Sequence, residues 1–378
     1  MDFSLEEEQE ALRDLALRIV GDLATHERLK LIDGDPDRVD RDLWAALARA
    51  QLLGVAVPEA QGGSGAGLVE LGLVLEAAGR HCAPVPLWET LVLGALPIAQ
   101  FGSAAQRERF LPAVARGELM LTAALVDVES EDPLAPTVTA RRDGAGWRLD
   151  GVKMCVPAAH LAGTVLVPAR TGEGTLGVFL LDPSGAGVTC ERQATTQGSP
   201  HGLVRLSGAP VGADGVLGDA AGGRAIVGWM VERALAGLCV LQAGVVERAL
   251  RMTAEYVSSR EQFGKPIGKF QAVAQRAADA YIDVAAIRWT AWQAIWRLAQ
   301  GLPAAEAVAV AKFWASEGGH RVVCAAQHLH GGIGIDLDYP LQRSYVWAKQ
   351  IELTLGSATR HLLDIGASMA DAPATDDA

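Results

Sequence analysis

The chain has 378 residues, of which 50% are hydrophobic and 21% charged, and its net charge is −12 at pH 7. This length exceeds one ordinary hydrophobic core, so two or three folding units are expected. An acidic chain without a basic block is a poor partner for nucleic acid or for an anionic membrane surface. No uncharged apolar run is long enough to span a bilayer, and the acidic start MDFSLEEEQE does not resemble a basic signal peptide.

The cysteines indicate a reducing compartment. There are five, at positions 82, 155, 190, 239 and 324, an odd number without CxxC spacing. This pattern argues against a disulfide framework and against structural zinc. We therefore expect a soluble cytoplasmic protein that holds no metal.

In chain order, the residue patterns of the sequence predict three domains. Residues 1–118 show apolar positions at the three- and four-residue spacing of helices. Residues 119–220 contain short Val-, Thr- and Leu-rich runs separated by Gly, Asp-Gly and Pro, which indicates strands. Residues 221–368 return to long helices, and 369–378 read as a disordered tail. The predicted fold class is α+β multi-domain: a helical domain, an antiparallel β-barrel-like domain and a four-helix bundle.

The segment REQFGKPIGKFQ, residues 260–271, interrupts the long helices of the third domain. A helix that only packed against its neighbours would not carry two glycines and a proline here. An arginine supplies a fixed positive fork for phosphate, and an aromatic ring supplies a flat face. The segment therefore predicts contact with an anionic, flat ligand.

Three segments in this order resemble the acyl-CoA dehydrogenase family, and the resemblance covers nearly the whole chain. LLGVAVPEAQGGSGAG is similar to the family's N-terminal LG…P…GG.G region. REQFGKPIGKFQ is similar to its R..FG..I..FQ segment, and HGGIGIDLDYP to its GG.G….YP segment. The resemblance implies an FAD-dependent oxidoreductase of fatty acid or steroid degradation. It also implies a tetrameric assembly, an acyl-CoA substrate and electron-transfer flavoprotein as the electron acceptor.

By this resemblance the interrupted segment reaches across a subunit interface to the ADP half of a neighbour's FAD. Arg260 then pairs with the pyrophosphate, Phe263 offers its ring, and Gln271 meets the ribose or adenine edge. Gln262 and Ile267 belong to the same expected cofactor contact. The competing interpretation is a solvated turn in which Arg260 pairs with Glu261.

A second stretch, AAQHLHGGIG, is expected at the same cofactor. The family's flavin-contacting Gln falls at His328, and Gln327 lies one place earlier, so either residue is a candidate donor. Gly331 and Gly332 complete this contact, and Ser357 is a further expected one. His328 and His330 lack a third ligand, so we do not expect a metal.

The family's reaction needs a carboxylate base beside the substrate α carbon. Where most members carry Glu in YEGT, this chain reads LTLGS and has Leu355. Some branches place the base on the first long helix of the C-terminal domain, before an Arg, and the matching pair here is Glu232 and Arg233. An apolar helix edge would raise the pKa of Glu232. The competing interpretation is a surface Glu favoured by the helix dipole, and Glu352 is a poor substitute base.

The middle domain departs from the family's pattern. Cys155 and Pro157 replace the Trp and Thr that contact the flavin ring, and proline removes a backbone donor. Val126 lacks the hydroxyl that members use, and the loop after it carries four carboxylates, Asp127, Glu129, Glu131 and Asp132. Such a loop is poorly suited to an electron-rich reduced flavin.

Several interpretations follow. The chain is an active dehydrogenase with Glu232 as base, in a homotetramer, or it is one subunit of a heterotetramer with a paralogous chain. In the second case it supplies the ADP pocket while the paralogue holds the flavin ring. A flavin monooxygenase or oxidase of the same fold and a binding-only role are further alternatives. Leu355 in place of Glu leaves room around the acyl chain, which favours a bulky, branched or ring-bearing acyl group.

Overall fold

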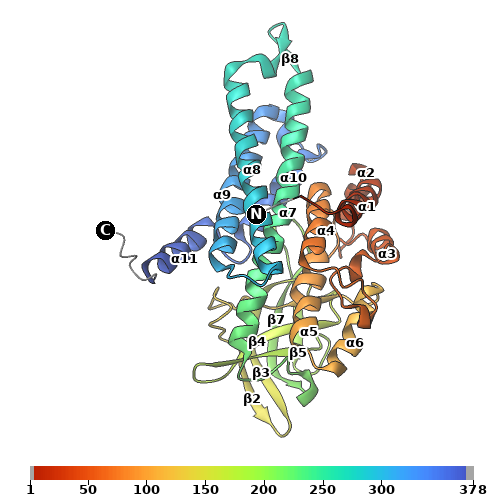
Figure 1. The fold of residues 1–378 in the computed structure, drawn as a ribbon, viewed down its shortest axis with the longest axis vertical. Coiled ribbons are helices and arrows are strands. Elements are labelled where there is room, and N and C mark those ends of the chain that lie inside the picture. Colours follow the sequence, from red (N-terminus) through yellow and green to blue (C-terminus); the bar gives the residue numbers. More distant parts are fainter. Residues whose placement is uncertain (1–3, 372–378) are drawn as a thin grey trace. The chain divides into compact units, whose positions relative to one another are not determined.

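The structure is a computed structural model that describes residues 4–371 (Figure 1). The chain forms two compact units. The N-terminal unit comprises Ser4–Ala78 and Ala83–Gly237, and the C-terminal unit comprises Gly79–Cys82 and the chain from Leu238 onward. Helix α7 (Gly223–Ser259) begins in the first unit and ends in the second.

Helices occupy the first third of the described chain. They are α1 (Glu7–Leu23), α2 (His26–Asp33), α3 (Arg41–Arg49), α4 (Leu68–His81), α5 (Leu96–Phe101) and α6 (Ala104–Ala115), with short 3₁₀ turns η1 (Leu52–Gly54) and η2 (Glu59–Gln61). Helix α6 starts where the sequence signals it, because Ser103 and Gln106 form a reciprocal capping box. Between α4 and α5 the segment η3 (Trp88–Ala95) is a π-helix, a form that is rare and frequent at functional sites.

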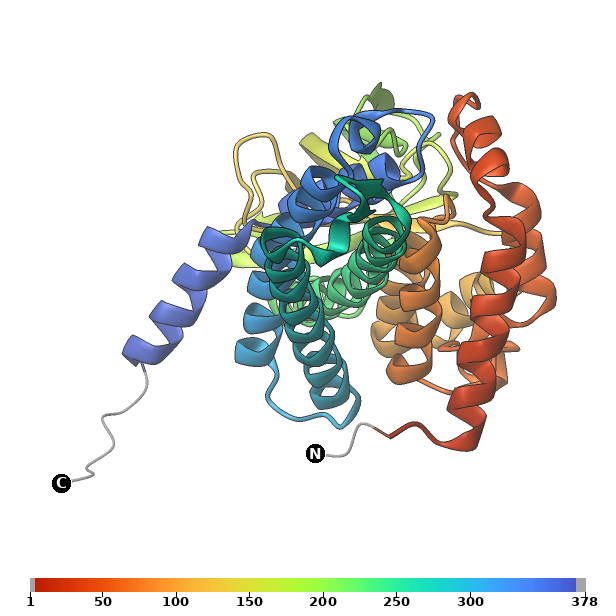
Figure 2. The ribbon, with the colours of Figure 1, turned by 90° about the horizontal axis from the view of Figure 1, so that it is seen from above.

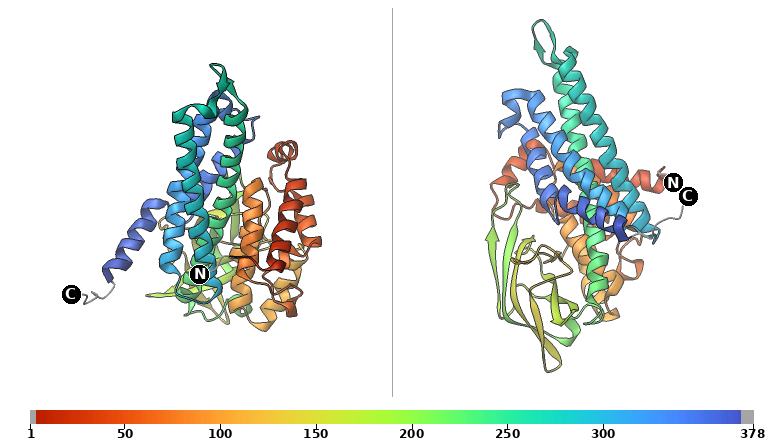
Figure 3. Two further views of the ribbon diagram at one scale, coloured as in Figure 1. Left: turned by 45° about the horizontal axis from the view of Figure 1, so that its top comes forward. Right: turned by 90° about the vertical axis from the view of Figure 1, so that its left-hand side faces the viewer.

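Seven strands form one curled, mostly antiparallel sheet (Figure 3). They are β1 (Leu121–Ala123), β2 (Thr139–Asp143), β3 (Gly146–Pro157), β4 (Thr164–Gly172), β5 (Thr175–Leu181), β6 (Val188–Gln193) and β7 (His201–Val211). Their order is β1-β4-β2-β3-β7-β6, with β5 on β4, and the 3₁₀ turn η4 (Ala213–Gly215) follows. Two pairings, β1 with β4 and β2 with β4, are parallel, which the sequence pattern alone did not predict.

The inner face of the sheet is a continuous apolar core. Trp147 and Phe179 meet edge to face with ring centroids 5.3 Å apart, and Val165, Val167 and Val204 are fully buried around them. Alternation along each strand directs these side chains to one face. Strand β3 pairs with β7 from Trp147 to Pro157, but the register shifts between Lys153 and Val156. This irregularity lies where the sequence departs from the family's flavin-contacting strand.

The C-terminal unit is a bundle of long helices. The bundle contains the end of α7, then α8 (Gln271–Ala299), α9 (Ala305–His330) and α10 (Leu341–Leu353), and α11 (Ala358–Asp371) follows it. A two-stranded hairpin, β8 (Glu261–Gln262) and β9 (Lys265–Pro266), joins α7 to α8 through the turn η5 (Ile267–Lys269), and η6 (Gly331–Ile335) follows α9. The hairpin lies at the far end of the α7–α8 pair (Figure 1), and α11 projects away from the bundle (Figure 2).

The predicted fold class is confirmed: helices, then a mostly antiparallel sheet, then a four-helix bundle. Helix α7 is long and apolar enough to cross a membrane by length and composition, yet 67% of its most apolar window is buried inside the structure. Helix α11 continues to Asp371, so the predicted tail from residue 369 begins as helix, and residues 372–378 lie outside the described chain.

Candidate active site

The segment at 260–271 is a tight hairpin between two long helices. Phe263 and Gly264 both have positive φ, 53° and 76°, which is the backbone of a type I′ turn. A Cβ added at Gly264 would meet no atom of the chain within 4 Å. Gly264 therefore serves the turn itself, and no described neighbour crowds its backbone.

The hairpin presents its functional side chains outward. Phe263 is 92% exposed, and its only aromatic partner among the described residues is Phe270, in an edge contact at 6.1 Å. Arg260 is exposed and has no ion pair or hydrogen bond from its guanidinium within the described chain, so the alternative pairing with Glu261 is not formed. A φ of 53° is strained for a phenylalanine. The exposed ring on a strained backbone and the unpaired guanidinium fit a ligand that comes from outside this chain.

The end of α9 offers the second cofactor contact. His328 is exposed and Gln327 is half-buried, so His328 is the more accessible of the two candidate donors. A Cβ at Gly331 or Gly332 would meet nothing within 4 Å, which leaves their backbone open to a ligand. His330 instead is buried and stacks on Tyr256, with ring centroids 4.4 Å apart. Among the described residues no group of His, Cys, Asp and Glu is placed to hold a metal ion.

The turn that carries Leu355 is held from inside the bundle. Leu355 and Gly356 have φ of 56° and 97°, and the buried Lys312 donates to the carbonyl oxygens of Glu352 and Gly356 at 3.1 and 2.8 Å. His361 bonds the carbonyl of Leu355 at 3.1 Å, and Ser357 is half-buried beside this turn. The backbone of this turn is therefore fixed from inside the bundle, and Leu355 itself cannot take a proton.

Glu352 is not available as a substitute base. Its carboxylate accepts a 2.6 Å hydrogen bond from Lys349 and lies 3.6 Å from His320. The carboxylate is therefore engaged by neighbouring side chains of its own chain and is not free to approach a substrate.

Glu232 and Arg233 form a half-buried pair near the start of α7. The guanidinium of Arg233 lies 3.8 Å from the Glu232 carboxylate, stacks 3.8 Å over the ring of Trp229, and is 14% exposed. Burial raises the pKa of Glu232, and the nearby Arg233 opposes that rise. Burial lowers the pKa of Arg233 to about 10. Glu232 is 36% exposed, so its carboxylate is neither sealed in the core nor surrounded by bulk water.

The strand expected to touch the flavin ring is occupied by the chain's own side chains. Cys155 is exposed with a φ of 50°, and its backbone N–H donates to the side-chain oxygen of Gln193 at 2.8 Å. The hydroxyl of Thr122 donates to the carbonyl of Pro157 at 2.7 Å. A donor that already has a partner within the chain is not free for a ring.

The expectation that four carboxylates crowd the loop after Val126 needs a correction. Asp127 is buried and pairs with the buried Lys153 at 2.9 Å, and its other oxygen accepts the N–H of Val138 at 3.3 Å. Burial lowers the pKa of Lys153, and Asp127 opposes this. One of the four charges is thus neutralised inside the sheet, and it cannot act on a cofactor.

Glu89 is a further candidate for proton transfer, and the sequence pattern did not indicate it. It lies on the π-helix η3, beside Trp88, whose indole N–H donates to the carbonyl of Ala234 on α7 at 2.9 Å. Burial raises the pKa of Glu89 to about 7, close to the value suited to proton transfer. The available signal was a single Glu inside the apolar run PLWETLVLGALP.

Comparison with known proteins matches both ends of the chain to one family. Residues 6–118 match the acyl-CoA dehydrogenase N-terminal domain and residues 222–370 the acyl-CoA dehydrogenase C-terminal domain. The chain is 40% identical to the acyl-CoA dehydrogenase FadE27 of Mycobacterium tuberculosis over 99% of this chain and 100% of that protein.

Two solved structures are similar over almost their whole length. One is the ChsE4-ChsE5 complex from Mycobacterium tuberculosis, with a TM-score of 0.94, 40% identity, and coverage of 99% of this chain and 100% of the other. The other is a variant of the Tcur3481-Tcur3483 steroid ACAD, with a TM-score of 0.91, 45% identity, and coverage of 97% and 98%.

The three-part fold and the exposed side chains expected to contact a nucleotide, Arg260 and Phe263, define a flavin-dependent oxidoreductase. More narrowly, the chain belongs to the acyl-CoA dehydrogenase family: it is an oxidoreductase acting on acyl-CoA, and its cofactor is FAD. The residues present fit the ADP half of that cofactor, because Arg260, Phe263 and the open backbone of Gly331 supply charge, a flat ring and room. The fit to the flavin ring is poorer, since the Cys155 amide is already bonded.

Proposed function

We propose that this chain is one subunit of a heteromeric acyl-CoA dehydrogenase and binds the ADP half of the FAD whose ring lies in a paralogous subunit. The observation that carries the proposal is a contrast within the chain. Phe263 is 92% exposed and the exposed Arg260 has no partner for its guanidinium within the described chain, whereas the Cys155 N–H on the strand expected to contact the flavin ring is bonded to Gln193. Two similar solved structures, ChsE4-ChsE5 and Tcur3481-Tcur3483, are each named for two components, which supports the proposal.

In the assembly this chain binds and orients. Arg260 pairs its guanidinium with the pyrophosphate, and Phe263 and Ile267 exclude water from one side of the adenosine. Gln262, Gln271 and His328 are further hydrogen-bonding side chains of this contact, and Gln327 and Ser357 remain candidates. Bound FAD supplies the hydride acceptor for α,β-dehydrogenation of an acyl-CoA thioester. In the alternative in which this chain holds its own flavin ring and acyl group, Leu355 in place of a charged residue favours a bulky, branched or ring-bearing acyl group.

A second candidate function has its own observation. The raised pKa of Glu232 and its partial exposure are suited to a general base, which would make this chain catalytic with its own flavin ring. In that case the Glu232 carboxylate takes the α proton of the thioester and Arg233 limits how far its pKa rises. Electron-transfer flavoprotein is the proposed electron acceptor in both cases.

The deciding experiment is the FAD-to-chain ratio of protein purified alone and after co-expression with a paralogous chain. Half an FAD per chain in the co-expressed complex, and little or none in the chain alone, is the expected result. One FAD per chain in the protein alone, bleached anaerobically by an acyl-CoA, would overturn the heteromeric proposal in favour of Glu232. Oxygen-dependent turnover of a small amine without bleaching by acyl-CoA would point to an oxidase instead.

A further inference from the structure

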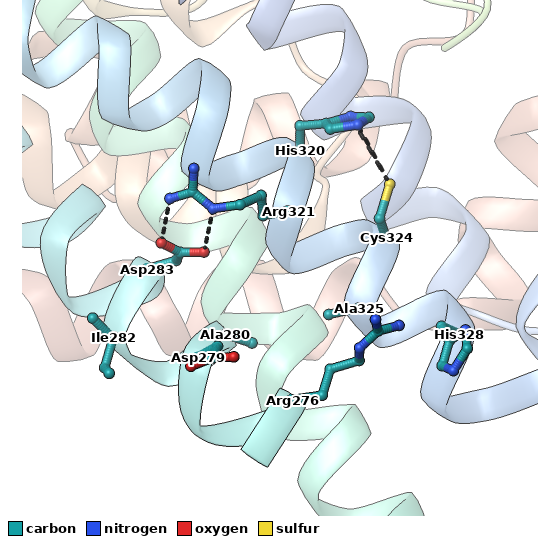
Figure 4. Close-up of a pocket in the computed structure, with 10 residues that line it drawn as sticks. All are labelled: Arg276, Asp279, Ala280, Ile282, Asp283, His320, Arg321, Cys324, Ala325 and His328. Carbon is teal, nitrogen blue, oxygen red and sulfur yellow. Dashed lines mark hydrogen bonds and ion pairs between the residues drawn. The ribbon is translucent and has the colours of Figure 1, made fainter. Parts of the chain in front are cut away.

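A pocket of about 730 Å³ lies between helices α8 and α9 of the C-terminal unit (Figure 4). One end of it is bordered by Arg276 and Ala280 from α8 and by Ala325 and His328 from α9. The two alanines leave space that larger side chains would fill. His328 lies three positions before the open Gly331, so this end of the pocket adjoins the expected ADP contact along the chain.

The charged side chains of the pocket differ in whether they have a partner within the chain. Arg321 is satisfied, because it pairs with both oxygens of Asp283 at 2.9 and 2.5 Å and with Glu317 at 3.2 Å. Arg276, in contrast, has no ion pair or hydrogen bond from its side chain within the described residues, and neither has Asp279 one turn away. Figure 4 shows Arg276 extending from α8 toward Ala325 and His328.

We propose that Arg276 is a further cofactor-binding residue of this chain, whose guanidinium binds a phosphate of the partner-held FAD with His328 as a neighbouring donor. The inference rests on the proposed function. An exposed arginine that projects into a hollow without a carboxylate partner is a phosphate ligand by charge and by its fork of N–H donors. It also offsets the change at position 328, where the family's amide is replaced by an imidazole.

Asp279 allows the proposal to be tested with a side chain of opposite charge in the same pocket. Its carboxylate lies on the same pocket wall and repels a phosphate, so removing its charge has the opposite effect to removing the charge of Arg276. The variants Arg276→Gln and Asp279→Asn are therefore compared in the assembled complex with the paralogous chain. Arg251→Gln, which changes an exposed arginine of α7 outside the pocket, is the matched control.

The measurement is the FAD dissociation constant of the complex, followed by flavin fluorescence on titration into stripped protein at several salt concentrations. Arg276→Gln is expected to weaken FAD binding by about tenfold and to flatten its salt dependence. Asp279→Asn is expected to tighten binding by about two- to threefold, and Arg251→Gln to leave it unchanged. Native mass spectrometry and circular dichroism confirm that each complex is assembled and folded.

The outcomes separate this inference from the proposed function. If Arg276→Gln leaves FAD affinity unchanged while Arg260→Gln weakens it, the role of Arg276 is overturned and the ADP pocket stands. If Arg276→Gln dissociates the subunits but assembled complexes keep their FAD affinity, the pocket holds a partner's carboxylate and the inference also fails. If neither arginine affects FAD binding, the ADP pocket itself is contradicted.

Discussion

The backbone N–H of Cys155 on β3 donates to the side-chain oxygen of Gln193 on β6, 2.8 Å away. Both strands pair with β7, and Cys155 has a φ of 50° at the register shift of β3. The bond therefore stabilises an irregular backbone at the position where other family members meet the flavin ring. In the heteromeric proposal, this bond is one reason why the flavin ring lies in a paralogous subunit.

Replacing Gln193 with Ala is expected to destabilise the chain modestly. The lost hydrogen bond is partly exposed, so water can replace it, and the expected decrease in the free energy of unfolding is about 0.5–1 kcal/mol. Urea unfolding checks this, with Gln197→Ala as control. A decrease as large in the control as in Gln193→Ala would show that the bond to Cys155 has no special role.

Replacing Lys153 with Met is expected to be much more damaging. It leaves the carboxylate of Asp127 buried without its partner, and losing one member of a buried pair costs about 3–5 kcal/mol. The double variant Asp127→Asn, Lys153→Met removes both charges and should recover part of that loss. Equal stability of the single and double variants in urea unfolding would contradict the pairing.

Lys312 predicts a pH dependence in the alkaline range. Burial lowers its pKa from an ordinary value of 10.5 to about 8 in the folded chain. Between these values the unfolded chain binds more protons, so stability relative to Lys312→Met rises as pH increases from about 8 to about 10, by up to about 3 kcal/mol. Urea unfolding at pH 7, 8, 9 and 10 measures this difference. A difference that falls over this range would contradict the buried, hydrogen-bonded position.

Glu89 predicts the opposite sign in the acidic range. Its folded-state pKa of about 7 exceeds its ordinary value of 4.5, so the folded chain binds more protons between these values. Stability contributed by Glu89 is therefore lost as pH rises from about 4.5 to 7, and Glu89→Gln should stabilise the chain above pH 7 by about 1–2 kcal/mol. Thermal unfolding at pH 5 and pH 8 tests this, and a stabilisation that is equal at both pH values would place Glu89 in water.

Arg233 tests whether Glu232 is the base. Arg233 opposes the rise in the Glu232 pKa, so Arg233→Gln should shift the acidic limb of the kcat/KM profile to higher pH. Arg224→Gln, at an exposed position of the same helix, should leave that limb in place. A limb that stays fixed in Arg233→Gln shows that the titrating base is elsewhere, as the heteromeric proposal expects.

The sequence by itself determined the features that depend on local chain geometry. The helix–sheet–helix order follows from apolar periodicity, and the interruption of the long helices at Arg260–Gln271 follows from two glycines and Pro266 between two helical patterns. These signals act over a few residues, so they can be recognised without knowing what lies across the fold. The same is true of the substitution of Leu355 for a base, because it is a matter of residue type.

Only the tertiary structure decided which polar groups are buried, hydrogen-bonded or ion-paired. Gln193 reaches Cys155 across 38 positions, Lys153 neutralises Asp127 across 26, and Lys312 holds the Leu355 turn across 44. Glu89, on the π-helix η3, acquires its high pKa from burial. Burial and pairing depend on residues far apart along the chain. Charged side chains that look alike in the sequence therefore become ion-paired, exposed or shifted in pKa only after folding.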